Sequence, residues 1–226
     1  MTHPKGTQEE QYNICIQYQK ERGLESLGLM TSQAWYDDPK RLGFTLARYK
    51  FVAKMFSGRK QVLEVGCADA FGTRIVVQEV ERLTATDFDP LFIEDVKNRM
   101  TERWSFDCVV HDMLKAPMPG KFDAAYALDV LEHIPASQED LFIQHMIAPL
   151  DTDGVVIFGM PSLESQDYAS PISKAGHVNC KSMPDFKALI SRYFKNVFMF
   201  SMNDEVVHTG YYKMAHYLFA LGCGKH

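Results

Sequence analysis

The segment Gln61-Val-Leu-Glu-Val-Gly-Cys-Ala-Asp-Ala-Phe-Gly72 constrains the fold more than any other part of the chain. A short apolar strand ends in Glu64 and Gly66, at the point where a helix must begin. Glycine lets the backbone turn tightly and come close to a ligand, and the free N–H groups of the following helix attract polar groups. The junction therefore indicates an α/β domain with a nucleotide-like ligand at the strand end.

A second short strand, Leu83-Thr-Ala-Thr-Asp87, ends in an acid about twenty residues further on, where doubly wound folds commonly hold a ribose hydroxyl pair. From residue 60 onward, strand-like runs alternate with stretches suited to helices. The expected strands are 61–65, 83–86, 106–110, 122–128 and 154–160. Such alternation predicts a mostly parallel sheet with helices on both faces.

The C-terminal part of the chain has a different pattern. The runs 197–201 and 213–221 read as two β segments joined by a polar loop without a helix, so we expect them to pair antiparallel. Upstream, Asp89-Pro90 is typical of a helix start, and Ser182-Met-Pro-Asp185 resembles a capping box.

The first 58 residues are expected to form a helical cap beside the binding site. Residues 7–30 predict one helix and a loop, with breaks at Gly23 and Gly28. A stronger helix follows, which Asp37 or Asp38 caps and in which Pro39 occupies the first turn. Its apolar residues recur at helical spacing before Gly58: Leu42, Leu46, Tyr49, Val52 and Phe56. We expect one domain over 1–226, with a cap over 1–58 and a core over 59–226.

The glycine turn and its partner acid resemble motif I of the class I S-adenosylmethionine-dependent methyltransferases. That motif reads hydrophobic-hydrophobic-acid-x-Gly-x-Gly-x-Gly, and Glu64, Gly66, Ala68 and Ala70 match it, with alanine in place of two glycines. Gly72 is expected to supply some of the missing backbone freedom. The resemblance extends over roughly 59–160 and implies a doubly wound, mostly parallel, seven-stranded Rossmann-like sheet with an antiparallel C-terminal strand.

The resemblance also implies which residues bind S-adenosylmethionine. Asp87-Phe88 corresponds to the ribose-binding acid and its neighbour, His111-Asp112-Met113 to the adenine-contacting turn, and Leu128 to the edge of the active site. The implied cofactor residues are Glu64, Gly66, Ala68, Asp87, Phe88, Asp112, Met113 and Leu128. The alternative is a tight turn with a capping acid that binds nothing, and Asp112 alone could simply cap a turn.

A second set of side chains follows the fourth expected strand. If the chain turns helical there, Asp129, Glu132 and His133 project from one side, beside the ligand crevice. His177 comes from the loop after the next strand. Asp-x-x-Glu-His with a later His resembles the metal-binding set of enzymes that 2′-O-methylate small RNA ends, in which the first acid is Glu, and of ubiquinone-pathway O-methyltransferases.

Mixed carboxylate and imidazole ligands suit Mg²⁺, Mn²⁺ or Zn²⁺, and the sequence does not choose among them. Such an ion would orient adjacent hydroxyls and lower the pKa of one. The plain alternative is that Glu132-His133 is a surface feature of this family that only stacks or hydrogen-bonds near the cofactor. Without a metal, His133 or His177 is the candidate general base, because a neutral imidazole accepts a proton near neutral pH.

Composition limits the partners. The chain has 226 residues, 46% of them hydrophobic, and 24 Lys and Arg against 29 Asp and Glu without a long basic run, so duplex nucleic acid is disfavoured. No stretch approaches the roughly 20 apolar residues of a membrane span, and Met1–Gln8 is too polar for a secretory signal. Five cysteines without a Cys-x-x-Cys pair argue against a disulfide framework. We expect a cytoplasmic protein with a small-molecule substrate; its oligomeric state stays open.

The favoured function is S-adenosylmethionine-dependent O-methylation of a small hydroxylated compound, such as a sugar or another diol, with metal assistance as a further expectation. Leu128-Asp-Val-Leu131 stands where nucleic-acid amino-methylating enzymes carry Asn/Asp-Pro-Pro-aromatic, so methylation of DNA bases is disfavoured. A nicotinamide-dependent oxidoreductase shares the glycine turn and distant acid and remains an alternative. A non-catalytic cofactor-binding partner subunit is a second one. The sequence does not define the methyl acceptor.

Overall fold

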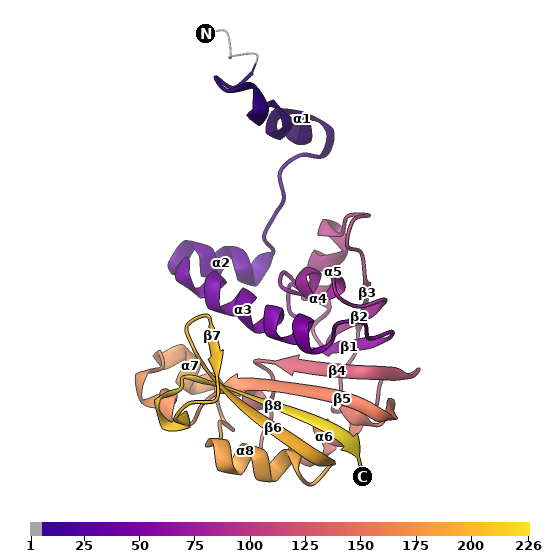
Figure 1. The fold of residues 1–226 in the computed structure, drawn as a ribbon, viewed down its shortest axis with the longest axis vertical. Helices are drawn as coiled ribbons and strands as arrows, with labels where there is room; N and C mark the ends of the chain where they lie inside the picture. Colours follow the sequence, from indigo (N-terminus) through magenta and orange to yellow (C-terminus); the bar gives the residue numbers. More distant parts are fainter. Residues whose placement is uncertain (1–5) are drawn as a thin grey trace.

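A mixed β-sheet runs through the computed structural model, which describes residues 6–226 (Figure 1). Residues 1–5 lie outside this range; they belong to the polar segment Met1–Gln8 and to the cap expected over 1–58. Within it, the sheet has eight strands in the order β3-β2-β1-β4-β5-β8-β6-β7. The strands are β1 Val62–Val65, β2 Leu83–Asp87, β3 Asp107–Val110, β4 Phe122–Leu128, β5 Leu150–Pro161, β6 Phe194–Asn203, β7 Val206–His208 and β8 Tyr217–Lys225.

The five strands β3, β2, β1, β4 and β5 are parallel, as the sequence predicted. Each lies where an apolar run was expected. Strand β1 is central and is buried along its whole length, and its carboxyl end leads into the glycine turn. The carboxyl ends of β1, β2 and β4 therefore meet at one edge of the sheet, where open α/β sheets bind ligands.

The C-terminal strands complete the sheet antiparallel. Strand β8 pairs antiparallel with both β5 and β6, which confirms the expected antiparallel terminal pair. Two details differ from the prediction. The second segment was expected to begin at Lys213, but that residue lies in a 3-10 helix, Tyr212–Met214, and β8 begins at Tyr217. The expected loop also contains β7, which pairs with β6 around a tight turn at Asp204 (φ 47°) and adds an eighth strand to the expected seven.

Helices cover both faces of the sheet (Figure 1). Side chains along β4 alternate between two cores: Ala125 and Ala127 pack with α6 and α8, and Tyr126 packs with α3, α4 and α5. The helices are α1 Asn13–Arg22, α2 Leu29–Asp37, α3 Lys40–Met55, α4 Thr73–Val77, α5 Pro90–Arg99, α6 Glu139–Ile147, α7 Pro171–Gly176 and α8 Met183–Ile190. The predicted helix starts are confirmed, because Asp89 accepts a hydrogen bond from Leu91 N and Ser182 one from Asp185 N.

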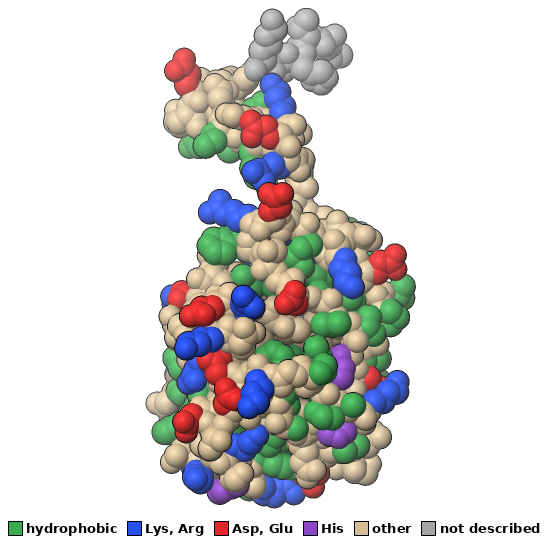
Figure 2. Space-filling view, turned by 90° about the vertical axis from the view of Figure 1, so that its right-hand side faces the viewer, with side chains coloured by type: hydrophobic (Ala, Val, Ile, Leu, Met, Phe, Trp, Pro, Cys, Tyr) green, Lys and Arg blue, Asp and Glu red, His purple; other side chains and the backbone are tan. Residues whose placement is uncertain are grey.

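The cap consists of α2 and α3, and α1 projects beyond it (Figures 1 and 2). Helix α3 was predicted, but Pro39 is its N-cap residue and not part of its first turn, which begins at Lys40. Asp38 Oδ1 accepts a hydrogen bond from Lys40 N at 3.3 Å. Helix α2 was not predicted, because the sequence indicates only a loop between Gly28 and the start of the next helix near Asp38. Among the described residues, none of the helices combines the length and the apolar character of a membrane span.

Candidate active site

A cavity of about 630 Å³ opens at the carboxyl ends of β1, β2 and β4. The sheet edge forms its floor, and α2 and α3 contribute one wall. Seven of the eight expected cofactor residues line it: Gly66, Ala68, Asp87, Phe88, Asp112, Met113 and Leu128. The structure thus brings together residues that the sequence separates by more than sixty positions.

The turn after β1 has a left-handed backbone at three positions. Gly66 has φ 75°, and a Cβ there would lie 2.3 Å from Val130 Cγ2, so only glycine fits. Ala68 (φ 45°) and Ala70 (φ 51°) keep this conformation although they carry a side chain. A left-handed alanine costs roughly 1–2 kcal/mol, which the surrounding contacts must offset. The alanines therefore preserve the shape of the turn.

Gly72 has a different role from the one expected. Its φ is −76°, an ordinary right-handed value, so it supplies no unusual backbone freedom. A Cβ at this position would lie 2.2 Å from the ring of Tyr49 on α3. Gly72 therefore provides the space that lets the cap helix pack closely on the turn.

Asp87 faces the cavity and braces the turn at the same time. Its carboxylate accepts hydrogen bonds from Ala68 N and from Asp89 N, both at 2.9 Å. The residue is buried, whereas its neighbour Phe88 is 71% exposed and forms part of the cavity rim. A carboxylate held in this way presents its remaining lone pairs to a ligand in a fixed orientation.

Glu64 lies behind the turn and does not line the cavity. Its Oε2 accepts a hydrogen bond from Thr73 Oγ1 at 2.7 Å, which joins β1 to the first residue of α4. Burial raises the pKa of Glu64 to about 7, although polar contacts with Thr73, Tyr126 and Tyr49 act in the opposite direction. In this structure Glu64 therefore supports the turn from below, and its contact with the cofactor stays a prediction.

Asp112 fits both of its expected roles. Its Oδ1 accepts a hydrogen bond from Leu114 N at 3.0 Å, and its carboxylate pairs with Lys115 Nζ at 3.1 Å, as a turn-capping acid would. Asp112 and the buried Met113 also line the cavity. Burial acts to raise the pKa of Asp112, but the pairing with Lys115 and the hydrogen bond from Leu114 N together outweigh it and lower the pKa, so Asp112 is ionised at neutral pH.

Asp129, at the carboxyl end of β4, pairs with Arg48 of α3. Arg48 Nη1 lies 2.8 and 2.7 Å from the two carboxylate oxygens, and the guanidinium stacks on the Tyr217 ring at 3.8 Å. The sequence did not predict this pair, although an arginine four residues from both Phe44 and Val52, on the inward stripe of an amphipathic helix, is the signal that an acid of the protein body faces it.

Three of the four expected metal ligands form a cluster. One ligand atom each of Glu132, His133 and His177 lies within 4.8 Å of the others, and the two imidazole centroids are 5.2 Å apart. Asp129 is not part of this cluster, because Arg48 holds its carboxylate. The predicted helical turn is present as the 3-10 helix Leu131–His133.

Glu132 is the most unusual member of the cluster. It is fully buried, and neither carboxylate oxygen has a hydrogen-bond partner among residues 6–226, although His133 Nε2 lies 4.0 Å from Oε1. Burial, followed by repulsion from Asp129, raises its pKa well above the usual range. A buried carboxylate without partners is costly unless it is protonated or meets a cation.

Both histidines are held so that one ring nitrogen stays available. His133 Nδ1 lies 2.9 Å from Gly176 O, and His177 Nδ1 lies 2.8 Å from Gln166 Oε1. Because oxygens of this kind only accept, each Nδ1 carries the proton, and Nε2 keeps its lone pair in the neutral ring. Burial, with repulsion from His133, lowers the pKa of His177 and favours that neutral form. His133 lines the cavity, and His177 stands behind it.

Comparison with known proteins agrees with this arrangement. A family model described as a methyltransferase domain matches residues 62–154. Nodulation protein S of Bradyrhizobium diazoefficiens is 30% identical over 143 residues, which are 60% of this chain and 68% of that protein. The N-methyltransferase NodS from Bradyrhizobium japonicum WM9, solved with S-adenosyl-L-homocysteine, has a TM-score of 0.60 at 21% identity and covers 84% of this chain and 90% of its own.

A further structural neighbour is the methyltransferase domain of bacterial CtHen1-C, with a TM-score of 0.65 at 15% identity over 80% of this chain and 98% of its own. At such identities the solved structures establish the fold. Together with the family model and the curated relative, they show that the chain belongs to the class I S-adenosylmethionine-dependent methyltransferases. The oxidoreductase and the non-catalytic partner subunit are thereby set aside.

Proposed function

We propose that the protein methylates a hydroxyl of a small polar acceptor, such as a sugar or another diol, and that a divalent cation at Glu132, His133 and His177 assists. The observation that carries the proposal is the fully buried Glu132 carboxylate, which accepts no hydrogen bond from the described residues and stands beside two imidazoles with available nitrogens. Two neutral imidazoles and a carboxylate suit Mn²⁺ or Zn²⁺, and Mg²⁺ less well.

The cavity supports a defined placement of the cofactor. S-adenosylmethionine supplies an activated methyl group on a sulfonium, so the protein mainly has to align donor and acceptor. Asp87 and Phe88 would hold the ribose, Asp112 and Met113 the adenine, and the turn from Gly66 to Ala68 the methionine part. Leu128 then borders the methyl group, next to His133.

Without a bound cation, His133 is the proposed proton acceptor at the edge of the cavity, because its Nε2 then keeps a free lone pair. Its Nε2 takes the proton of the acceptor hydroxyl while the oxygen bonds to the methyl carbon and the carbon–sulfur bond breaks, which leaves S-adenosylhomocysteine. A bound cation would instead use His133 Nε2 as a ligand, hold neighbouring hydroxyls and lower the pKa of one of them, so that its proton passes to solvent. His177 and Glu132 orient this edge of the site.

A methylated amine is the second candidate product, because the neighbour solved with S-adenosyl-L-homocysteine is an N-methyltransferase. An amine needs the same proton acceptor but gains nothing from a cation that binds vicinal hydroxyls. Methyl transfer from labelled S-adenosylmethionine to matched diol and amino-sugar acceptors, with the product analysed by mass spectrometry, distinguishes the two.

The metal is tested separately. Protein purified without a histidine tag should contain about one equivalent of Zn or Mn by inductively coupled plasma analysis, and Glu132→Gln should lose it. Chelation should reduce turnover, and the same ion should restore it. Full activity without bound ion, or unchanged metal content in Glu132→Gln, would contradict metal assistance and leave His133 as a simple general base.

A further inference from the structure

The cap and the glycine turn are joined by a buried carboxylate that neither the motif nor the metal set includes. Asp69 is 3% exposed and lies between the left-handed residues Ala68 and Ala70. Its Oδ2 accepts a hydrogen bond from Thr31 N at 2.6 Å, and its Oδ1 accepts one from Thr31 Oγ1 at 3.0 Å. A side chain of the turn thus holds the first turn of α2.

A third segment closes the same junction. Arg99, at the end of α5, donates to Asp69 O at 2.6 Å and to Asp95 Oδ2 at 2.7 Å, and Asp95 Oδ2 also accepts from Leu29 N at 3.4 Å. Gly28 has φ 104°, and a Cβ there would lie 2.7 Å from both the Asp69 carboxylate and the Arg99 guanidinium. Segments from α2, the glycine turn and α5 therefore meet in close contact.

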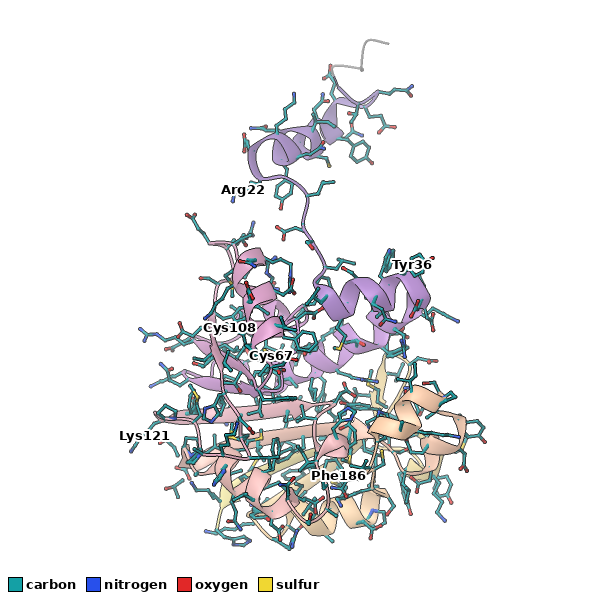
Figure 3. All side chains as sticks on the ribbon, turned by 180° about the vertical axis from the view of Figure 1, so that it is seen from behind. Arg22, Tyr36, Cys67, Cys108, Lys121 and Phe186 are labelled. Carbon is teal, nitrogen blue, oxygen red and sulfur yellow. The ribbon has the colours of Figure 1, made fainter. Side chains whose placement is uncertain are left out.

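Helix α2 contacts α3 but is otherwise lightly anchored. None of its residues is buried, and Trp35 and Tyr36 are 53% and 88% exposed. Figure 3 shows Tyr36 on the outer side of the cap, while Cys67 marks the glycine turn in the body of the protein. The inner side of α2 nevertheless closes the cavity, because Met30, Thr31 and Ala34 line it. The seating of this wall therefore depends strongly on the bond to Asp69.

We propose that Asp69 is a positioning residue that couples occupation of the glycine turn to the seating of α2 over the cavity. This rests on the proposed placement of S-adenosylmethionine on that turn. A turn fixed by ligand keeps Ala68 and Ala70 in their left-handed conformation and aims the Asp69 carboxylate at Thr31. By thermodynamic reciprocity, a seated α2 must then strengthen cofactor binding.

Three variants separate coupling from simple loss of structure. Asp69→Ala removes both bonds, Thr31→Val removes only the hydroxyl bond from the cap side, and Ser32→Ala removes the neighbouring exposed hydroxyl as a matched control. Calorimetry measures the affinity for S-adenosylhomocysteine, and hydrogen exchange over residues 29–37 measures the order of α2 with and without it.

We expect S-adenosylhomocysteine to slow exchange over residues 29–37 in the native protein and in Ser32→Ala. Affinity should fall about tenfold in Asp69→Ala and about threefold in Thr31→Val, and the ligand-dependent protection of α2 should shrink in the same order. If Asp69→Ala does not fold by circular dichroism, Thr31→Val decides the question by itself.

The coupling would be overturned if folded Asp69→Ala bound S-adenosylhomocysteine with native affinity and showed native protection of α2. The same result in Thr31→Val would overturn it if Asp69→Ala does not fold. An effect of Ser32→Ala equal to that of the other variants would also overturn it. A native protein that does not bind S-adenosylhomocysteine at all would instead contradict the proposed placement of the cofactor. The two failures are therefore distinguishable.

Discussion

Single residues determine how the cavity holds a ligand, and Asp87 is the clearest test. Asp87→Ala should lower the affinity for S-adenosylhomocysteine at least about tenfold. The substitution removes a charged hydrogen-bond acceptor for the ligand and also the hydrogen bonds that Ala68 N and Asp89 N donate to the Asp87 carboxylate. Calorimetry measures the change. Asp107→Ala, an exposed acid on the neighbouring strand β3, is the matched control and should bind normally. Unchanged affinity in Asp87→Ala would show that the ribose lies elsewhere.

Glu64 predicts a pH dependence of stability. Its pKa rises from the usual 4.5 to about 7 in the folded protein, so between these values the folded chain holds more protons than the unfolded chain. The free energy of unfolding must therefore fall as the pH rises through this window, by up to about 3 kcal/mol from this group.

Glu64→Gln should remove that part of the pH dependence. Denaturant titrations at pH 4.5 and 7.5 give the free energy of unfolding at each pH, and the change between the two values is compared for the native protein and the variant. Glu102 is exposed, so Glu102→Gln serves as the control and should keep the native change of unfolding free energy with pH. A Glu64→Gln protein with native pH dependence would mean that Glu64 titrates normally in the fold.

The sequence predicted the positions of those cavity residues that follow from local spacing. Gly66, Asp87 and Leu128 stand at strand ends, and a strand end fixes its own place at the sheet edge. It did not predict the Arg48–Asp129 pair or the Asp69–Thr31 bond, because each joins residues that only tertiary packing brings together. It also placed Asp129 with the metal ligands, whereas the structure pairs it with an arginine from the cap.

At the level of elements, the parallel strands were predictable because short buried strands leave continuous apolar runs in the sequence. Helix α2 was missed because it buries none of its residues and carries little helical periodicity. Strand β7 was missed because three residues at a sheet edge leave no recognisable pattern. Elements held by packing can be predicted from sequence, whereas those held by a few polar contacts cannot.

The ion pair between α3 and β4 predicts how the cap is fastened. Arg48→Met should lower the free energy of unfolding by about 1–3 kcal/mol, because it leaves a partly buried carboxylate without its charge partner. The double variant Arg48→Met/Asp129→Asn should lose less free energy of unfolding than the sum of the losses in the two single variants. A double-mutant cycle by chemical denaturation measures this difference.

Arg41→Met is the matched control for that cycle, since Arg41 lies on the same helix but is exposed. It should leave stability within about 0.5 kcal/mol of native. Strictly additive effects of Arg48→Met and Asp129→Asn would show that the ion pair contributes nothing to the attachment of the cap.

For the whole molecule, the same sheet edge gathers the glycine turn, Asp87, the Glu132–His133–His177 cluster and the cap. Figure 2 shows acidic and basic side chains intermingled on the face that it presents, with α1 standing away from the body. The order of the parallel strands by itself places Gly66, Asp87 and Leu128 at one end of the sheet. In the proposed function the methyl acceptor meets the residues around His133, and the fold class does not determine which acceptor they bind.

A crystal structure of the complex with S-adenosylhomocysteine tests the central claim most directly. The account predicts the ligand in the 630 Å³ cavity, with its ribose hydroxyls on Asp87, its amino-acid part on the turn from Gly66 to Ala68 and its sulfur next to Leu128. Ligand bound at another place, or an empty cavity at saturating concentration, would contradict it.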